Sequence, residues 1–269
     1  FRAGVNAGNS IASGGNYNVT VGDEAGTALT TGDNNVAVGY RALEDNTTGA
    51  GNTALGTIAL PNNTTGADNV SIGHLSMGDN STGTNNVAVG KQALTANTTA
   101  SNNTAVGYQA GVAVTTGVNN TLVGGLAGDA LTTGDSNIAI GYVSLSSDTK
   151  GERAVAVGEG ALFTQNFTSE TNNYNTAVGY NAGYGVTTGV KNTFIGGLSG
   201  DATTTAEENT AVGYESMTTN TTGGDNSASG AYSLRMNTTG SNNAAMGYSA
   251  LEQNTTGGSN TAVGYKALE

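Results

Sequence analysis

The sequence has 269 residues, of which 43 are Gly, one is Pro and none is Cys or Trp, and its formal net charge is −12. The lack of Cys excludes disulfides and thiolate metal sites, and the acidic charge argues against nucleic acids and anionic membranes as partners. No apolar run is long enough for a transmembrane helix and no signal peptide is recognisable, so we expect no membrane insertion within this segment.

The first residues differ from the rest of the chain. Residues 1–17 are rich in Gly and follow no clear period, so we expect an irregular N-terminal coil there and a repeat domain over residues 18–269. The sequence starts at Phe1 rather than Met, which indicates a processed chain or a fragment.

From residue 18 onward a Gly that closes an N-T-A-V-G-like motif recurs every 17 residues, with one interval of 21. A 17-residue unit is too short for a helical-pair repeat or a propeller blade. The period predicts an all-β parallel β-solenoid of about fifteen coils, each with two or three short strands and Gly corners. These turn glycines are Gly22, Gly39, Gly56, Gly73, Gly90, Gly107, Gly124, Gly141, Gly158, Gly179, Gly196, Gly213, Gly230, Gly247 and Gly264.

The columns of the repeat predict an inside and an outside. We expect the apolar residue before each turn glycine, such as Val38 or Val106, to be buried, because strands alternate faces. Ala42 and Leu43 represent two further columns that we expect inside. Where the Leu43 position holds Gly, as at Gly111, the position three residues later is apolar instead of Asn, with Gly200 and Thr203 as a weak member of this class. This exchange predicts one core pocket per coil that is filled from either position.

An Asn stands four residues before each turn glycine, and only Ala154 breaks the column. Stacked Asn side chains at strand spacing form hydrogen-bonded ladders, and Asn tolerates a left-handed corner. We therefore interpret the column as structural. Its members are Asn18, Asn35, Asn52, Asn69, Asn86, Asn103, Asn120, Asn137, Asn175, Asn192, Asn209, Asn226, Asn243 and Asn260.

A second Asn precedes the recurrent Thr-Thr-Gly segment, which we expect to be a β-branched strand that ends in a turn. In a secreted eukaryotic chain these Asn-x-Thr sequons would accept glycans on a surface loop. We favour the alternative that Asn-Thr-Thr-Gly is reused turn chemistry. The sequons lie at Asn46, Asn63, Asn80, Asn97, Asn220, Asn237 and Asn254.

Irregularity is concentrated between Gly158 and Gly179, where the coil gains four residues. The segment 163–167 holds two of the four Phe, and Asp148, Lys150, Glu152 and Arg153 form the densest charge cluster just before it. An inserted loop on a rigid scaffold can carry recognition, although a tolerated insertion is the simpler interpretation.

We find no candidate catalytic, cofactor-binding or metal-binding residue. The single His74 occupies a variable position after a turn glycine and is expected to be exposed. No His is placed to activate the many Ser and Thr, and no EF-hand or nonapeptide calcium spacing occurs. The sequence therefore predicts a protein that is not an enzyme and needs no cofactor.

The motif Asn103-Thr104-Ala105-Val106-Gly107, followed by Ala110, resembles the head repeat of YadA-like trimeric autotransporter adhesins. The longer unit, with its N-T-T-G corner, is similar to repeats in phage tail fibres. The likeness spans about residues 18–269. It implies a left-handed β-roll, a homotrimer and a location that is extracellular, on a cell surface or on a virion. The unit is three residues longer than the usual 14-residue adhesin coil, and we expect no stalk, anchor or chaperone domain within these residues.

The leading functional prediction is a structural repeat segment of a surface fibre, adhesin or tail fibre. Alternatives are an ice- or glycan-binding solenoid and a subunit of a glycosylated extracellular filament, while a solenoid lyase or hydrolase would need clustered carboxylates and bases that the sequence lacks. We expect self-association as a homotrimer, with a host surface or a glycan as a further partner and an open end covered by further sequence or another subunit. The tyrosines of one column are expected to line a contact edge: Tyr40, Tyr108, Tyr142, Tyr180, Tyr214, Tyr248 and Tyr265.

Overall fold

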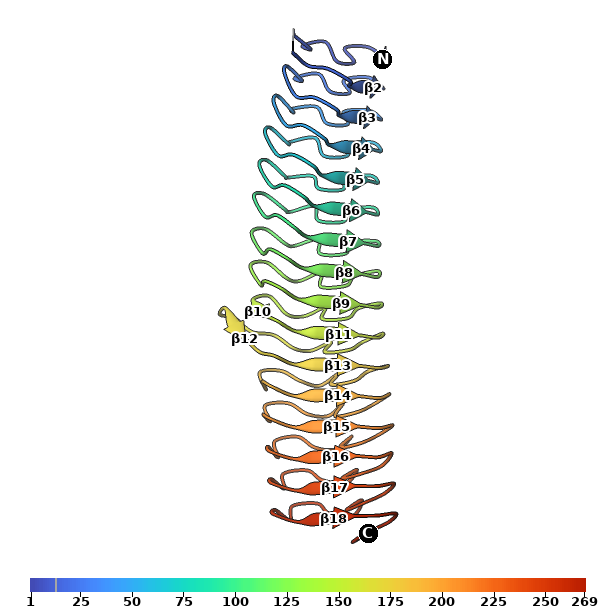
Figure 1. The fold of residues 1–269 in the computed structure, drawn as a ribbon, viewed down its shortest axis with the longest axis vertical. Coiled ribbons are helices and arrows are strands. Elements are labelled where there is room, and N and C mark those ends of the chain that lie inside the picture. The colour runs from blue at the N-terminus through green and yellow to red at the C-terminus, as the bar shows by residue number, and fades with distance from the viewer. Residues whose placement is uncertain (13) are drawn as a thin grey trace. The chain divides into compact units, whose positions relative to one another are not determined.

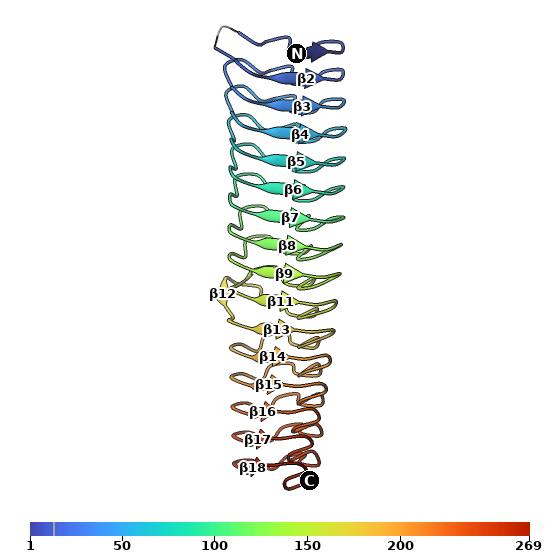
Figure 2. The ribbon, with the colours of Figure 1, turned by 45° about the vertical axis from the view of Figure 1, so that its right-hand side comes forward.

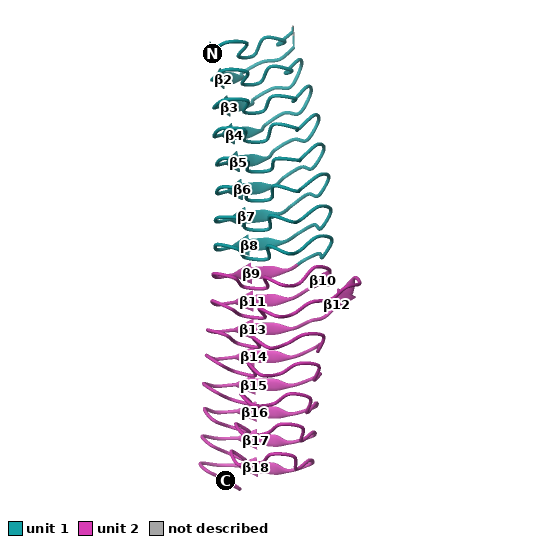
Figure 3. Cartoon of the chain, turned by 180° about the vertical axis from the view of Figure 1, so that it is seen from behind, with its two compact units in different colours: residues 1–136 teal, residues 137–269 magenta. Residues whose placement is uncertain are grey.

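The computed structural model describes residues 1–12 and 14–269, and these residues form two compact units over 1–136 and 137–269 (Figure 3). Both units are parallel β-solenoids, and no helix occurs in the described residues. Within each unit, consecutive coils stack so that their strands lie side by side (Figures 1 and 2). The predicted fold class, a parallel β-solenoid with 17-residue coils, is confirmed.

The strands are short, and most coils contribute one strand of three residues. Unit 1 contains β1 (Arg2–Ala3), β2 (Val19–Val21), β3 (Val36–Val38), β4 (Thr53–Leu55), β5 (Val70–Ile72), β6 (Val87–Val89), β7 (Thr104–Val106) and β8 (Thr121–Val123). Unit 2 contains β9 (Ile138–Ile140), β10 (Gly151–Glu152), β11 (Val155–Val157), β12 (Thr171–Asn172), β13 (Thr176–Val178), β14 (Thr193–Ile195), β15 (Thr210–Val212), β16 (Ser227–Ser229), β17 (Ala244–Met246) and β18 (Thr261–Val263).

The pairing register repeats the sequence period. Val36 pairs with Val19 and Thr53 pairs with Val36, so each residue stacks on its equivalent 17 positions away. Residues 1–17 also form a coil, because β1 pairs in parallel with β2 and Gly4 adopts a φ of 134° like the later turn glycines.

The expectation of two or three strands per coil was wrong. Three residues of a regular coil have left-handed backbones, as at Asn34 (φ 59°), Arg41 (φ 54°) and Leu43 (φ 54°), and such residues interrupt an extended strand. The Thr-Thr-Gly segment is likewise a bend and not a strand. Outside the strands, hydrogen bonds between consecutive coils satisfy the backbone, for example from Leu43 N to the Ala59 carbonyl at 3.0 Å.

The turn glycine is required by close stacking between coils. A Cβ on Gly39 would lie 2.3 Å from the carbonyl oxygen of Gly56, the equivalent residue of the next coil, and Gly39 has a φ of 135°. Both the backbone conformation and the available space therefore exclude any other residue.

The predicted direction of the strand side chains was also wrong. Val38 is half-buried and Val106 is 36% exposed, whereas Ala37 and Ala105 are fully buried. The residues do alternate faces, but the small middle residue of each strand points inward. A thin coil leaves no room for a larger residue there, because the wall opposite already supplies a Leu43-type side chain. The Ala42 and Leu43 columns are buried as predicted, except at the last coil.

The exchange between neighbouring core positions is confirmed, but it includes a third position. Coils with Gly in the Leu43 column occur in adjacent pairs, which we call glycine doublets, and their Leu29, Val114, Leu131 and Val186 are buried. In each doublet the second coil carries a residue larger than Ala at the middle of its strand. Leu122 lies between Gly111 and Gly128, Phe194 between Gly183 and Gly200, and Thr20 between Gly8 and Gly26.

Candidate interaction surfaces

The Asn ladder is present and buried within each unit. Asn35 is fully buried. Its backbone N–H donates to Asn18 Oδ1 at 2.8 Å, and its Nδ2 donates to the Gly49 carbonyl at 2.9 Å. The left-handed residue is the one before the ladder Asn, such as Asn34. The ladder amides are therefore used entirely for coil-to-coil bonding, as the structural interpretation predicted.

The sequon asparagines form a second internal ladder. Asn63 Nδ2 donates to Asn46 Oδ1 at 2.8 Å and to the Gly66 carbonyl at 2.9 Å. Six of the seven sequon side chains are fully buried, and only Asn254 is partly exposed. These amides lie inside the coil and not on a surface loop, which favours the turn interpretation over glycan attachment.

The two threonines of the Thr-Thr-Gly bend have different roles. Thr47 Oγ1 donates to the Thr64 carbonyl at 3.0 Å, and the same bond recurs in other coils, whereas Thr48 is exposed. The bend therefore presents one hydroxyl column to solvent and uses the other within the stack.

The insertion changes the hydrogen bonding inside its coil. The extra residues form a loop over 167–173, which we call the inserted loop, and β12 within it pairs with β10 and stands out from the stacked coils of unit 2 (Figure 1). Asp148 replaces a sequon Asn, is fully buried and accepts hydrogen bonds from Gly151 N at 2.9 Å, Phe167 N at 3.1 Å and Gln165 Nε2 at 2.7 Å. Burial raises the pKa of Asp148 above 3.8, and these hydrogen bonds only partly oppose that effect.

The inserted loop also supplies the hydrogen bond that the Asn ladder would otherwise lack in this coil. Ala154 has no side-chain amide, so the backbone N–H of Asn175 donates instead to Asn173 Oδ1 at 2.9 Å, and Asn175 Nδ2 donates to Gln165 Oε1 at 2.8 Å. Sequence reasoning identified the charge cluster but missed Asp148 as a buried anchor. Its place in the sequon column was the available signal.

Few side chains are placed for catalysis or metal binding. His74 is exposed, as expected. In residues 1–12 and 14–269, no group of three or more His, Cys, Asp or Glu is placed to hold a metal ion, and no pocket is present. None of the described residues belongs to a helix that could cross a membrane.

An apolar sheet surface is exposed in both units. It consists of the outward side chains at the first and third positions of the three-residue strands, and we call it the strand face. Leu55 is 46% exposed, Ile140 is 39% and Ile195 is 41%. In some strands both outward residues are β-branched, as are Val87 and Val89 of β6. Val87 and Val89 are half-buried, and several strands, such as β4 and β7, carry Thr at the first position.

The tyrosine column is exposed, but it is not continuous. In unit 1, Tyr40 and Tyr108 are separated by Thr57, His74 and Lys91. In unit 2, ring contacts connect Tyr214, Tyr232, Tyr248 and Tyr265, with centroids 5.8, 5.5 and 5.6 Å apart in that order. We call these four residues the tyrosine strip. They come from four consecutive coils.

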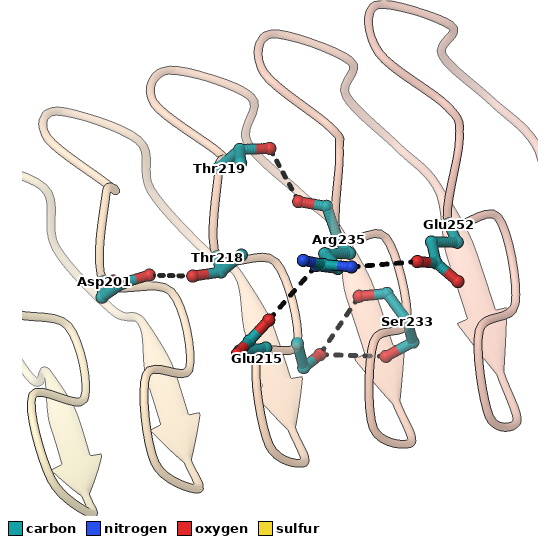
Figure 4. Close-up of polar contacts among 8 residues, drawn as sticks. Asp201, Glu215, Thr218, Thr219, Ser233, Arg235 and Glu252 are labelled. Atoms are coloured by element: carbon teal, nitrogen blue, oxygen red, sulfur yellow. Dashed lines mark hydrogen bonds and ion pairs between the residues drawn. The ribbon is translucent and has the colours of Figure 1, made fainter.

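Arg235, which contacts the Tyr232 ring, belongs to a polar network whose side chains are drawn in Figure 4. Arg235 contacts Glu215 at 3.2 Å and Glu252 at 3.3 Å, and its guanidinium lies 5.2 Å from the centre of the Tyr232 ring. Thr218 donates to Asp201, and Thr219 Oγ1 donates to the Arg235 carbonyl at 2.7 Å. A hydrogen bond with Glu215 raises the pKa of Tyr214.

Comparisons with protein-family models, with curated proteins and with solved structures find no match to this chain.

Proposed function

We propose that this chain is a structural segment of an extracellular fibre, on a cell or virion surface, and that it self-associates through the strand face as a parallel homotrimer without catalytic activity. The strand face is the observation that carries the proposal. Half-buried to exposed Val, Ile and Leu side chains recur at the third strand position of most coils, and such an array is a contact surface that favours burial.

Periodicity favours a second copy of the same chain as the occupant. The outward residues repeat with the strand spacing of about 4.8 Å. An identical solenoid aligned alongside presents the same repeat, so that an apolar side chain of one copy meets its equivalent in most coils. The number three comes from the resemblance to the YadA-like head repeat.

The change in polarity along unit 2 favours a parallel arrangement. The strand face begins with Ile138 and Ile140, whereas β16 presents Ser227 and Ser229. Parallel copies place apolar coils against apolar coils. An antiparallel pair would oppose isoleucine to serine and leave apolar area uncovered.

Sedimentation equilibrium tests the proposal directly. We expect a mass of three chains of 26.5 kDa each. Val106→Asp, on the strand face, should give single folded chains, because a carboxylate at the contact would be desolvated. Thr99→Asp, at an exposed position in the equivalent Thr98-Thr99-Ala100 bend, is the matched control and should remain trimeric. A parent protein that sediments as a single folded chain would contradict the proposal.

A further inference from the structure

The tyrosine strip is a second exposed surface, and neither the strand face nor the buried ladders account for it. Tyr214 is 48% exposed, Tyr248 is 45% and Tyr265 is 73%, although their rings touch one another through Tyr232. Large aromatic side chains that gather on a surface typically mark a binding site. In the rest of the described column the tyrosines are exposed without ring neighbours, so the strip is a local feature and not a property of the repeat.

The spacing of the strip favours a ligand that itself repeats. Each coil contributes one ring, and the centroids follow one another at 5.5–5.8 Å. A linear polysaccharide presents an apolar C–H face and a set of hydroxyls in each sugar unit. Its repeat can therefore follow the rings, whereas a single small molecule would cover only one or two of them.

The polar groups beside the strip suit sugar hydroxyls. The ion pairs of Arg235 with Glu215 and Glu252, drawn in Figure 4, bring planar donors and acceptors together, and the guanidinium lies 5.2 Å from the centre of the Tyr232 ring. A carboxylate that accepts one such contact keeps further lone pairs for hydroxyl donors. Lys266 and Glu269 form a similar pair at 2.8 Å in the coil of Tyr265.

The local charge selects against an acidic ligand. Four carboxylates lie along the strip but only two cations, and the whole chain carries a formal charge of −12. An anionic polymer would be repelled at this surface. The four acids are Asp201, Glu215, Glu252 and Glu269, and the two cations are Arg235 and Lys266.

We propose that the tyrosine strip, together with Arg235, Glu215 and Glu252, binds a neutral linear polysaccharide that lies along consecutive coils of unit 2. The site gives the proposed fibre a ligand class. It does not depend on the trimer, because all of its residues belong to one unit of one chain.

Calorimetric titration of the full chain with neutral hexasaccharides of glucose, xylose and mannose tests the proposal. At least one hexasaccharide should bind, and its disaccharide should bind at least about tenfold more weakly, because it covers fewer rings. Polygalacturonate serves as the acidic polysaccharide probe and poly-glutamate as the acidic peptide probe. Cellobiose serves as the short neutral probe. Binding of either acidic polymer as tightly as any neutral hexasaccharide, or no binding of any neutral hexasaccharide, would overturn the proposal.

Matched variants locate the site. Tyr248→Ala should weaken hexasaccharide binding at least about tenfold, whereas Tyr248→Phe should retain it because the ring remains. Tyr142→Ala is the control, since Tyr142 occupies the same column, is 55% exposed and has no ring neighbour among the described residues. Equal weakening by the two alanine variants would refute the assignment. Sedimentation of each variant separates this result from the outcome for the trimer.

Discussion

For single residues, the packing inside a coil depends on which position of the strand points inward. Ala105 is fully buried and Val106 is 36% exposed, although hydrophobicity alone suggests the reverse. The sequence shows that the two positions lie on opposite faces. It could not show which face is inside, because the limiting factor is the space between the two walls of the coil and not the apolar character of the side chain.

Aspartate substitutions at these two positions test the orientation. Ala105→Asp should lower the free energy of unfolding by several kcal/mol, because it buries an unpaired carboxylate. Val106→Asp should leave a single chain with cooperative unfolding and an unchanged far-ultraviolet spectrum. Urea unfolding followed by circular dichroism measures both. A Val106→Asp chain that unfolds while Ala105→Asp remains folded would contradict the orientation.

Asp148 gives the fold a local dependence on pH. Because burial raises the pKa of Asp148 in the folded protein above its usual 3.8, the folded state binds the proton more tightly than the unfolded state does. The contribution of Asp148 to stability is therefore fully present below pH 3.8 and is lost as the pH rises through the raised pKa.

Comparison with Asp148→Asn isolates this dependence, since the Asn variant restores the residue that other coils carry. The difference in unfolding free energy, parent minus variant, should become more favourable to the parent as the pH falls toward 3.8. Urea unfolding of both proteins across the acidic range measures the difference. A difference that is constant with pH, or one that changes in the opposite direction, would show that Asp148 does not titrate in this way.

The candidate surfaces were only partly predictable from residue patterns. The Asn ladder could be predicted because one residue type recurs at a fixed spacing. Asn173 could not, since it replaces a missing member of the column at a place where the chain leaves the period, whereas the place of Asp148 in the sequon column was a usable signal. The tyrosine strip depends on Tyr232, which stands one position away from the tyrosine column and fills the gap at Ala231.

At the scale of the coil, the period predicted the stacking of equivalent residues but not the number of strands. Left-handed residues such as Leu43 cost about 1–3 kcal/mol each when taken alone. Stacking with the next coil offsets this cost, and such long-range compensation leaves no signal in a local pattern. The glycine doublets were visible in the sequence, whereas the role of Leu122 and Phe194 required the structure.

Substitutions in the glycine doublet around Leu122 test whether its residues share one space. Val114→Asn should destabilise the coil, but Gly111→Leu alone should not rescue it, because a Cβ on Gly111 lies 2.6 Å from Leu122 Cδ1. Adding Leu122→Ala should make room for the new leucine. In a double-mutant cycle, Gly111→Leu and Leu122→Ala should couple favourably by about 1–3 kcal/mol in urea unfolding. Additive effects would mean that the two positions do not share one space.

At the scale of the whole molecule, the two faces of the strands have separate purposes. The inward face holds each coil together with small side chains and ladders, and a thin coil of this kind buries little apolar area of its own. The outward face retains apolar side chains that the fold of either unit does not use. The proposed self-association would bury these apolar side chains.

Cysteine cross-linking tests this claim most directly, because the chain has no native cysteine. Ile140→Cys and Met246→Cys place single thiols on the strand face near the two ends of unit 2, and Thr205→Cys places one in the equivalent Thr204-Thr205-Ala206 bend as the control. Under mild oxidation, each strand-face variant alone should form disulfide-linked dimers. The control should not, and a mixture of Ile140→Cys with Met246→Cys should give no mixed dimer. Mixed dimers, or cross-linking of Thr205→Cys alone, would contradict a parallel contact through the strand face.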